Sequence, residues 1–264
     1  MKVMKFGGTS VGKPERMRQI AQLITAGEEP VMVVLSALSG TTNALVEISN
    51  RLAAADKDGA TEKIAALENH YHHFVQDLLQ EPSLHARGMD MLNEHFEFLR
   101  ITQKISLSDA LNKDILAQGE LMSTKLFSLF LEQAKIEHAL LPALDFMRLD
   151  QNEEPDLTLI QEKLTAVLAN HPTKNIFVTQ GYICRNAKGE VDNLKRGGSD
   201  YTASLIAAAV KNLKTFGYPS VNKDNIFTDR IYQAFFISML NENKGQGAQV
   251  DAAIASLLSK LGPH

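Results

Sequence analysis

The amino-acid sequence predicts an α/β protein built around a mainly parallel sheet. Two short, mostly apolar runs, at residues 3–6 and 31–35, each end abruptly in a loop rich in glycine and hydroxyl side chains. A helical pattern follows each loop. The second run is continuous and rich in valine, which is typical of a strand buried on both faces. Because strand, polar loop and helix recur in this order, we expect a binding site at the ends of the strands.

The remaining elements up to residue 212 fit the same fold class. Residues 61–133 show apolar positions at helical spacing and no convincing strand, so several helices are expected there, some of them covering the site. The other elements that the pattern predicts are a helix starting near Pro14, strands near residues 139–141 and 175–179, a hairpin over residues 181–194, and an alanine-rich helix from about residue 199 to 210.

The character of the chain changes after residue 212. Residues 214–220 are typical of a linker, and two amphipathic segments follow, at residues 226–240 and 250–261. We therefore expect a body at residues 1–212 and a helical extension at residues 213–264. Apolar faces on these tail helices would favour association, which leaves a homodimer open.

Composition excludes several classes of protein. With 27 Lys and Arg against 31 Asp and Glu, the chain lacks the excess of positive charge that a nucleic-acid surface needs. It has no run of about 18 apolar residues, so no membrane span is expected. The first residues lack the apolar stretch of a signal peptide, and the single cysteine, Cys184, cannot form an internal disulfide. These features favour a cytoplasmic location.

The first candidate loop holds Lys5, Gly7, Gly8 and Thr9. A lysine near the end of a strand can direct its ammonium into a cleft, and the glycines let backbone N–H groups approach an anion. The alternative is an ordinary strand-to-helix turn, since short glycine motifs often occur by chance.

The second candidate loop covers residues 36–43. It begins at Ser36, and its Ser39 or Thr42 could hold a carboxylate or a phosphate group. The alternative is that Thr41 or Thr42 only caps the following helix.

Two further groups carry charge. Glu120 lies among apolar helix residues, and a buried carboxylate needs a cation, such as the amino group of a substrate. An exposed glutamate in a first helical turn is the alternative. Arg196 offers a planar guanidinium for a carboxylate or phosphate, and Asp200 lies near a helix N-terminus. There the alternative is that Ser199 or Asp200 is a plain helix cap.

No metal site is predicted. His70, His72 and His73 lie in a polar helical stretch without partner cysteines or spaced carboxylates, which favours a solvated helix face. The chain also lacks the glycine-rich motifs of P-loop and dinucleotide-binding proteins.

Together these segments resemble the aspartate kinase family, within the amino-acid-kinase fold. The resemblance is carried, in the order that the family has them, by residues 5–11, 33–43, 119–124, 179–181 and 196–202. It covers roughly residues 1–212, the N-terminal catalytic portion. It implies a three-layer αβα sandwich with a mainly parallel sheet, to which the helical extension is added.

The resemblance also implies a reaction. In this family MgATP phosphorylates the side-chain carboxylate of L-aspartate to give 4-phospho-L-aspartate, a step in lysine, threonine and methionine biosynthesis. L-Aspartate and ATP would be the small-molecule partners, and Mg²⁺ would arrive with the nucleotide. Lys5 would stabilise the transferred phosphoryl group and Asp200 would organise the reacting centre.

The other roles follow by matching position in the family's motifs. Glu120 would hold the substrate amino group. The carboxylates of the substrate would be bound by Thr42, Arg196 and Ser199. The phosphate groups of ATP would be bound by Gly7, Gly8, Thr9 and Ser36.

The sequence departs from the family after Lys211, where the family's later nucleotide-binding motifs are not visible, and at Lys195, where the family commonly has glycine. Two alternatives therefore stay open. One is a truncated, non-catalytic homologue that acts as a binding or interaction protein. The other is a different amino-acid kinase, such as a glutamate or carbamate kinase.

Overall fold

A computed structural model describes residues 1–194 and 198–211 of the chain. The chain divides into two units, Met1–Ser220 and Val221–His264, and every element described here belongs to the first. The predicted extension at residues 213–264, its boundary with the body, and Arg196 all lie outside the described residues.

The centre of the fold is a parallel sheet, as predicted. In the described part of the chain it has four strands in the order β1-β2-β4-β3, and every neighbouring pair is parallel. Every residue of β2 is buried, which explains its continuous apolar sequence. The strands are β1 (Lys2–Phe6), β2 (Val31–Leu35), β3 (Ala139–Leu140) and β4 (Ile176–Gln180).

Helices and one hairpin account for the other described elements. The predicted hairpin is confirmed, with β5 (Ile183–Arg185) antiparallel to β6 (Val191–Asn193). The helices predicted over residues 61–133 are also confirmed. The helices are α1 (Gly8–Val11), α2 (Pro14–Ile24), α3 (Thr41–Ala53), α4 (Lys57–Leu78), α5 (Pro82–Thr102), α6 (Asp109–Gln133), α7 (Ala143–Phe146), α8 (Leu157–Ala169) and α9 (Gly198–Lys211).

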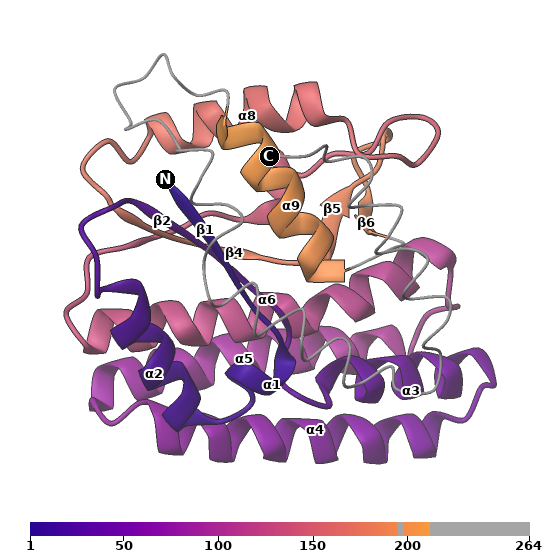
Figure 1. Cartoon of the computed structure of the whole chain (residues 1–264). Helices are drawn as coiled ribbons and strands as arrows, with labels where there is room; N and C mark the ends of the chain where they lie inside the picture. Colours follow the sequence, from indigo (N-terminus) through magenta and orange to yellow (C-terminus); the bar gives the residue numbers. More distant parts are fainter. Residues whose placement is uncertain (195–197, 212–264) are drawn as a thin grey trace, which may run out of the picture. The chain divides into compact units, whose positions relative to one another are not determined.

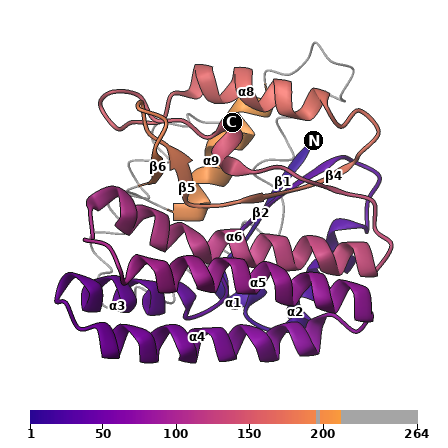
Figure 2. The ribbon, with the colours of Figure 1, turned by 180° about the vertical axis from the view of Figure 1, so that it is seen from behind.

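These helices cover both faces of the sheet. Figures 1 and 2 show α8 and α9 on one face, and α6 with the helices of the first half of the chain on the other. Helices α3, α4 and α5 pack in succession, and α5 packs on α6. The arrangement confirms the three-layer αβα sandwich. None of the described helices combines the length and the apolar character that a bilayer span requires.

Several helix starts are explained by side-chain caps. The carboxylate of Asp56 accepts the N–H of Gly59 at the start of α4, and Asp156 accepts the N–H of Leu159 at the start of α8. Helix α8 was not among the predicted elements, although Asp156 is the kind of cap that signals a helix start.

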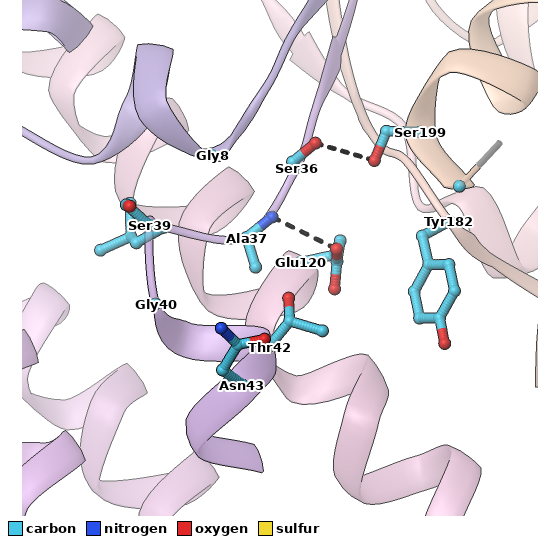
Figure 3. A pocket seen from close by; sticks show the side chains of 12 residues that line it. Gly8, Ser36, Ala37, Ser39, Gly40, Thr42, Asn43, Glu120, Tyr182 and Ser199 are labelled. Atoms are coloured by element: carbon cyan, nitrogen blue, oxygen red, sulfur yellow. Dashed lines mark hydrogen bonds between the residues drawn. The ribbon is translucent and has the colours of Figure 1, made fainter. Parts of the chain in front are cut away.

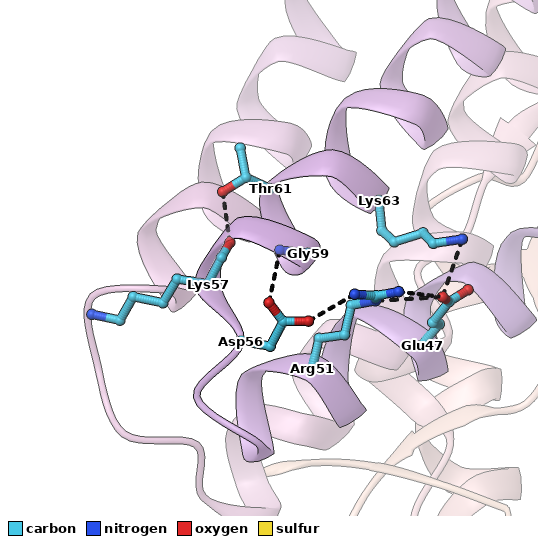
Figure 4. Close-up of polar contacts among 7 residues, drawn as sticks. All are labelled: Glu47, Arg51, Asp56, Lys57, Gly59, Thr61 and Lys63. Atoms are coloured by element: carbon cyan, nitrogen blue, oxygen red, sulfur yellow. Dashed lines mark hydrogen bonds and ion pairs between the residues drawn. The ribbon is translucent and has the colours of Figure 1, made fainter.

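A cluster of charges joins the end of α3 to the start of α4 (Figure 4). The guanidinium of Arg51 lies 3.2 Å from Glu47 and 2.7 Å from Asp56. Lys63 approaches the same Glu47 carboxylate at 3.1 Å. The cluster holds the C-terminal end of α3 against α4, while the N-terminal end of α3 points to the site described next.

Candidate functional site

A pocket of about 370 Å³ opens at the carboxyl ends of the parallel strands (Figure 3). Its walls come from the segments that follow β1, β2 and β4, and from helices α6 and α9. The lining residues are Gly8, Ser36, Ala37, Leu38, Ser39, Gly40, Thr42, Asn43, Glu120, Tyr182, Gly198 and Ser199. This is the position at which parallel α/β sheets bind ligands.

The register of the sheet brings these segments together at the carboxyl ends of the strands. Phe6 is paired with Leu35, and Leu35 with Gln180, so the three strands end level with one another. Backbone hydrogen bonds continue just beyond: the N–H of Ser36 donates to the carbonyl of Phe6, and the N–H of Gly181 donates to the carbonyl of Leu35. The three loops therefore leave the sheet side by side.

Lys5 and Asp200 form an ion pair next to this pocket. The ammonium nitrogen of Lys5, on β1, lies 2.9 Å from a carboxylate oxygen of Asp200, in the first turn of α9. The side chains are 17% and 44% exposed, so both groups remain open to a ligand. A Cβ atom at Gly7 would lie only 3.3 Å from the Lys5 ammonium, so glycine there leaves space beside the charge.

The N-terminus of α9 is held tightly against the strand ends. The hydroxyl of Ser36 donates to the hydroxyl oxygen of Ser199 at 2.9 Å (Figure 3). This approach requires glycine at position 181, because a Cβ atom there would overlap the side chain of Ser199 and lie 2.8 Å from its Cα. One small residue thus sets the distance between α9 and the end of β4.

Glu120 is buried in the pocket wall. It lies in the middle of α6 and is 3% exposed, so the interpretation as an exposed first-turn glutamate is wrong. Its Oε1 accepts the N–H of Ala37 at 3.3 Å, whereas its Oε2 is buried and has no hydrogen-bond partner among the described residues. Burial raises the pKa of Glu120 to about 7. A cation placed at Oε2 would satisfy this carboxylate.

The start of α3 is not capped by Thr41 or Thr42, which was the alternative to a ligand-binding role for this loop. Gly40, with a φ of +83°, is the N-cap, and Thr41 is already the first helical residue. A residue with helical backbone angles cannot cap its own helix, so the prediction that Thr41 or Thr42 is the cap is wrong. The Thr41 hydroxyl instead shares a buried hydrogen bond of 3.0 Å with the hydroxyl of Tyr71 on α4.

Two helix N-termini border the same pocket. Helices α3 and α9 each present their first turn to it, through Thr42 and Asn43 on one and Gly198 and Ser199 on the other. Unpaired N–H groups and the helix dipole make such ends favourable for anions. The pocket can therefore accept a ligand that carries anionic groups and a cation, with the cation at Glu120.

The structure brings most of the predicted site residues together. Six of them line the pocket, and Lys5, Gly7 and Asp200 lie beside it. Thr9 is exposed and does not line the pocket, and its carbonyl oxygen accepts a hydrogen bond from Arg16. Within residues 1–194 and 198–211, no group of three or more His, Cys, Asp or Glu gathers where it could hold a metal ion. The six lining residues are Gly8, Ser36, Ser39, Thr42, Glu120 and Ser199.

Sequence reasoning missed Tyr182, and it included Asn43 in the second candidate loop without giving that residue a role. Tyr182 follows β4 and Gly181, so its place directly after a buried strand was an available signal. Asn43 lies in the first turn of α3, and the glycine at its N-cap marked that turn. The backbone N–H of Ala37, which donates to Glu120, leaves no trace in the sequence because every residue except proline carries one.

The fold and the pocket define an α/β protein with a polar, charge-bearing cavity at the carboxyl ends of its parallel strands. Residues 1–221 match the amino acid kinase family, and the chain belongs to that family.

Its relatives include aspartokinases. The chain is 32% identical over 211 residues to the lysine-sensitive aspartokinase 3 of Escherichia coli, across 79% of this chain and 46% of that protein. It is also 32% identical over 219 residues to the aspartokinase of Chlamydia trachomatis, with the same shares of the two chains. The chain thus spans about half the length of these relatives.

A solved aspartokinase structure is similar to this chain in fold. Escherichia coli aspartokinase III in complex with aspartate and ADP, in its R-state, superposes with a TM-score of 0.69 at 30% identity. The match covers 80% of this chain and 47% of that one.

Proposed function

We propose that this chain carries the aspartate-binding and phosphoryl-transfer site of an aspartate kinase, which transfers the γ-phosphoryl group of ATP to the side-chain carboxylate of L-aspartate. The observation that carries the proposal is the Lys5–Asp200 ion pair beside a pocket in which a buried carboxylate oxygen of Glu120 lacks a partner among the described residues. The similarity to a protein solved with aspartate and ADP supports it.

The pocket suits an amino acid with two carboxylates. Glu120 Oε2 would accept the α-ammonium group, which repays the cost of burying this carboxylate. The Thr42 and Ser199 hydroxyls and the two helix N-termini would receive the carboxylates. Arg196, outside the described residues, remains a predicted carboxylate ligand.

Lys5 has the position to act on the transferred group. A side-chain carboxylate oxygen of aspartate would attack the γ-phosphorus, and the bond from phosphorus to the bridging oxygen of ADP would break, with its electron pair leaving on ADP. The Lys5 ammonium would stabilise the negative charge on the phosphoryl oxygens. Asp200 would hold the ammonium in place through their 2.9 Å contact.

The residues around the Lys5 ammonium would leave room for the phosphate groups of a nucleotide. Gly7 leaves space beside the Lys5 ammonium, and Gly8 and Ser36 line the pocket close to it. Mg²⁺ would arrive on the nucleotide phosphates, where it would neutralise their charge.

The direct test is ATP-dependent formation of aspartyl hydroxamate by the purified full chain. We expect product with L-aspartate and much less with glutamate, and loss of the signal in K5M. The matched control is K174M, because Lys174 forms a similar 3.1 Å ion pair with Glu137 away from the pocket. No product at high protein concentration, or equal activity of K5M and the wild type, would contradict the proposal.

Calorimetry separates the proposed kinase from the non-catalytic alternative, which the departure from the family's motifs after Lys211 leaves open. A kinase binds both ligands. A non-catalytic homologue would bind aspartate and show no heat with MgATP. The cytoplasmic location and the homodimer stay predictions, and gel filtration coupled to light scattering tests the latter.

A further inference from the structure

A second ion pair joins the helix of Glu120 to the hairpin. The ammonium of Lys113, on α6, lies 2.9 Å from the carboxylate of Asp192, on β6. Asp192 is only 4% exposed, and Lys113 also reaches Asp109 at 3.1 Å. A buried carboxylate is costly unless it is paired, so this contact ties the hairpin to α6 at a defined place.

Lys113 and Glu120 lie on the same side of α6. Glu120 is seven positions after Lys113, which is about two helical turns, so their side chains leave the helix in nearly the same direction. One end of this face holds the hairpin through Asp192, and the other end forms the pocket wall through Glu120.

The hairpin in turn carries Tyr182, which lines the pocket (Figure 3). The carbonyl of Tyr182 accepts the N–H of Leu194, directly after β6, and its own N–H donates to the Thr202 hydroxyl of α9 at 2.9 Å. Its φ of +66° is unusual for a residue with a side chain and persists only where neighbouring contacts impose it. The end of the hairpin therefore determines where the Tyr182 ring lies.

The electrostatics agree with this geometry. Burial raises the pKa of Tyr182, and the negative charges of Glu120 and Asp192 raise it further, so both carboxylates act on the same ring. Burial lowers the pKa of Lys113, but the hydrogen bonds and charges of Asp192 and Asp109 outweigh this, and the pKa of Lys113 lies above its usual value. Lys113 thus stays charged and balances Asp192.

We propose that Lys113 and Asp192 are positioning residues that set the separation of Glu120 and Tyr182 across the pocket, and thereby the affinity for the amino-acid substrate. The inference rests on the proposed function, in which Glu120 binds the substrate ammonium. Neither residue lines the pocket, so they act through the two side chains that do.

The test compares K113M and D192N with R87M. Arg87 is the matched control because it forms an exposed 2.6 Å ion pair between α5 and α6, with Glu132. We expect K113M and D192N to raise the KM for aspartate about tenfold, equivalent to about 1.4 kcal/mol at 25 °C, with kcat within about twofold of the wild type. K113R should restore most of the affinity, and R87M should leave it unchanged.

Amide hydrogen exchange supplies a readout that does not need activity. The amides of Tyr182 and Leu194 should exchange faster in K113M and D192N, while those of β2 stay protected. D192N keeps the shape of the side chain, so it carries the test if K113M does not fold. If the wild type lacks kinase activity, the proposed function is contradicted, and the dissociation constant for aspartate replaces KM here.

Three outcomes overturn the inference. Unchanged affinity and exchange in folded K113M and D192N would show that the ion pair holds nothing in place. Faster hydrogen exchange with unchanged affinity for aspartate would show that the Lys113–Asp192 ion pair stabilises the hairpin but does not affect substrate binding. Weaker affinity for aspartate with unchanged hydrogen exchange would show that the ion pair does not act on the pocket through the hairpin.

Discussion

Lys5 and Asp200 meet at 2.9 Å, although one lies on the first strand and the other on the last described helix of the chain. The contact exists because α9 packs over β1 and β2 with its first turn at their carboxyl ends. It places a cation beside a pocket that two helix N-termini already make favourable for anions.

Removing the charge of Asp200 should impair the reaction more than the fold. In D200N the Lys5 ammonium loses the partner that, in the proposed function, orients it toward the transferred phosphoryl group, so we expect kcat to fall about 100-fold. Because Asp200 is 44% exposed, the thermal midpoint should stay close to that of the wild type. Steady-state kinetics and thermal unfolding check this, and a D200N enzyme with wild-type kcat would remove Asp200 from the reacting centre.

Glu120 should make the unliganded protein less stable as the pH rises. Its pKa is raised by burial from 4.5 to about 7, so the folded state binds this proton more tightly than the unfolded state does. The resulting stability is fully present below pH 4.5 and is lost as the pH rises to about 7. We expect a loss on the order of 3 kcal/mol across this window.

Urea unfolding at pH 5 and pH 8 measures this loss. E120Q should lack that part of the pH dependence, because its amide does not titrate. E137Q is the control, since Glu137 is 80% exposed. If E120Q and the wild type lose stability in parallel, another group is responsible.

The affinity for aspartate should also depend on the ionisation of Glu120, but it should increase as the pH rises. In the proposed function the substrate ammonium binds the ionised carboxylate of Glu120, so the KM for aspartate should fall by about tenfold per pH unit as the pH rises toward 7, and then level off. The KM of E120Q should be higher and independent of pH over this range. A KM of the wild type that does not change between pH 5 and pH 8 would argue against an ammonium at this carboxylate.

A methyl group at position 181 should push α9 away from the strand ends. Because the added Cβ would overlap Ser199, G181A should lower the unfolding free energy by about 1–3 kcal/mol and raise the KM for aspartate. G27A is the matched control, since a Cβ atom at Gly27 has no neighbour within 4 Å. Equal behaviour of the two variants in urea unfolding and kinetics would contradict the steric argument.

Much of the site was predictable because its signals are local. The apolar runs at β1, β2 and β4 and the glycine- and hydroxyl-rich loops after them are properties of adjacent residues. So are the hairpin turn and the alanine-rich helix α9. Resemblance to a family added roles for Lys5 and Asp200, and these roles remain predictions.

Other features depended on segments that are far apart in the chain. The sequence by itself determined most of the strands, helices and loops, though not α8, because apolar period and turn residues act over a few positions. Only the tertiary structure decided that Glu120 is buried, that Thr41 bonds Tyr71 instead of capping α3, and that Asp192 pairs with Lys113. Whether a side chain loses water, and which partner it then finds, is decided by how distant elements pack, and the local pattern carries no record of that packing.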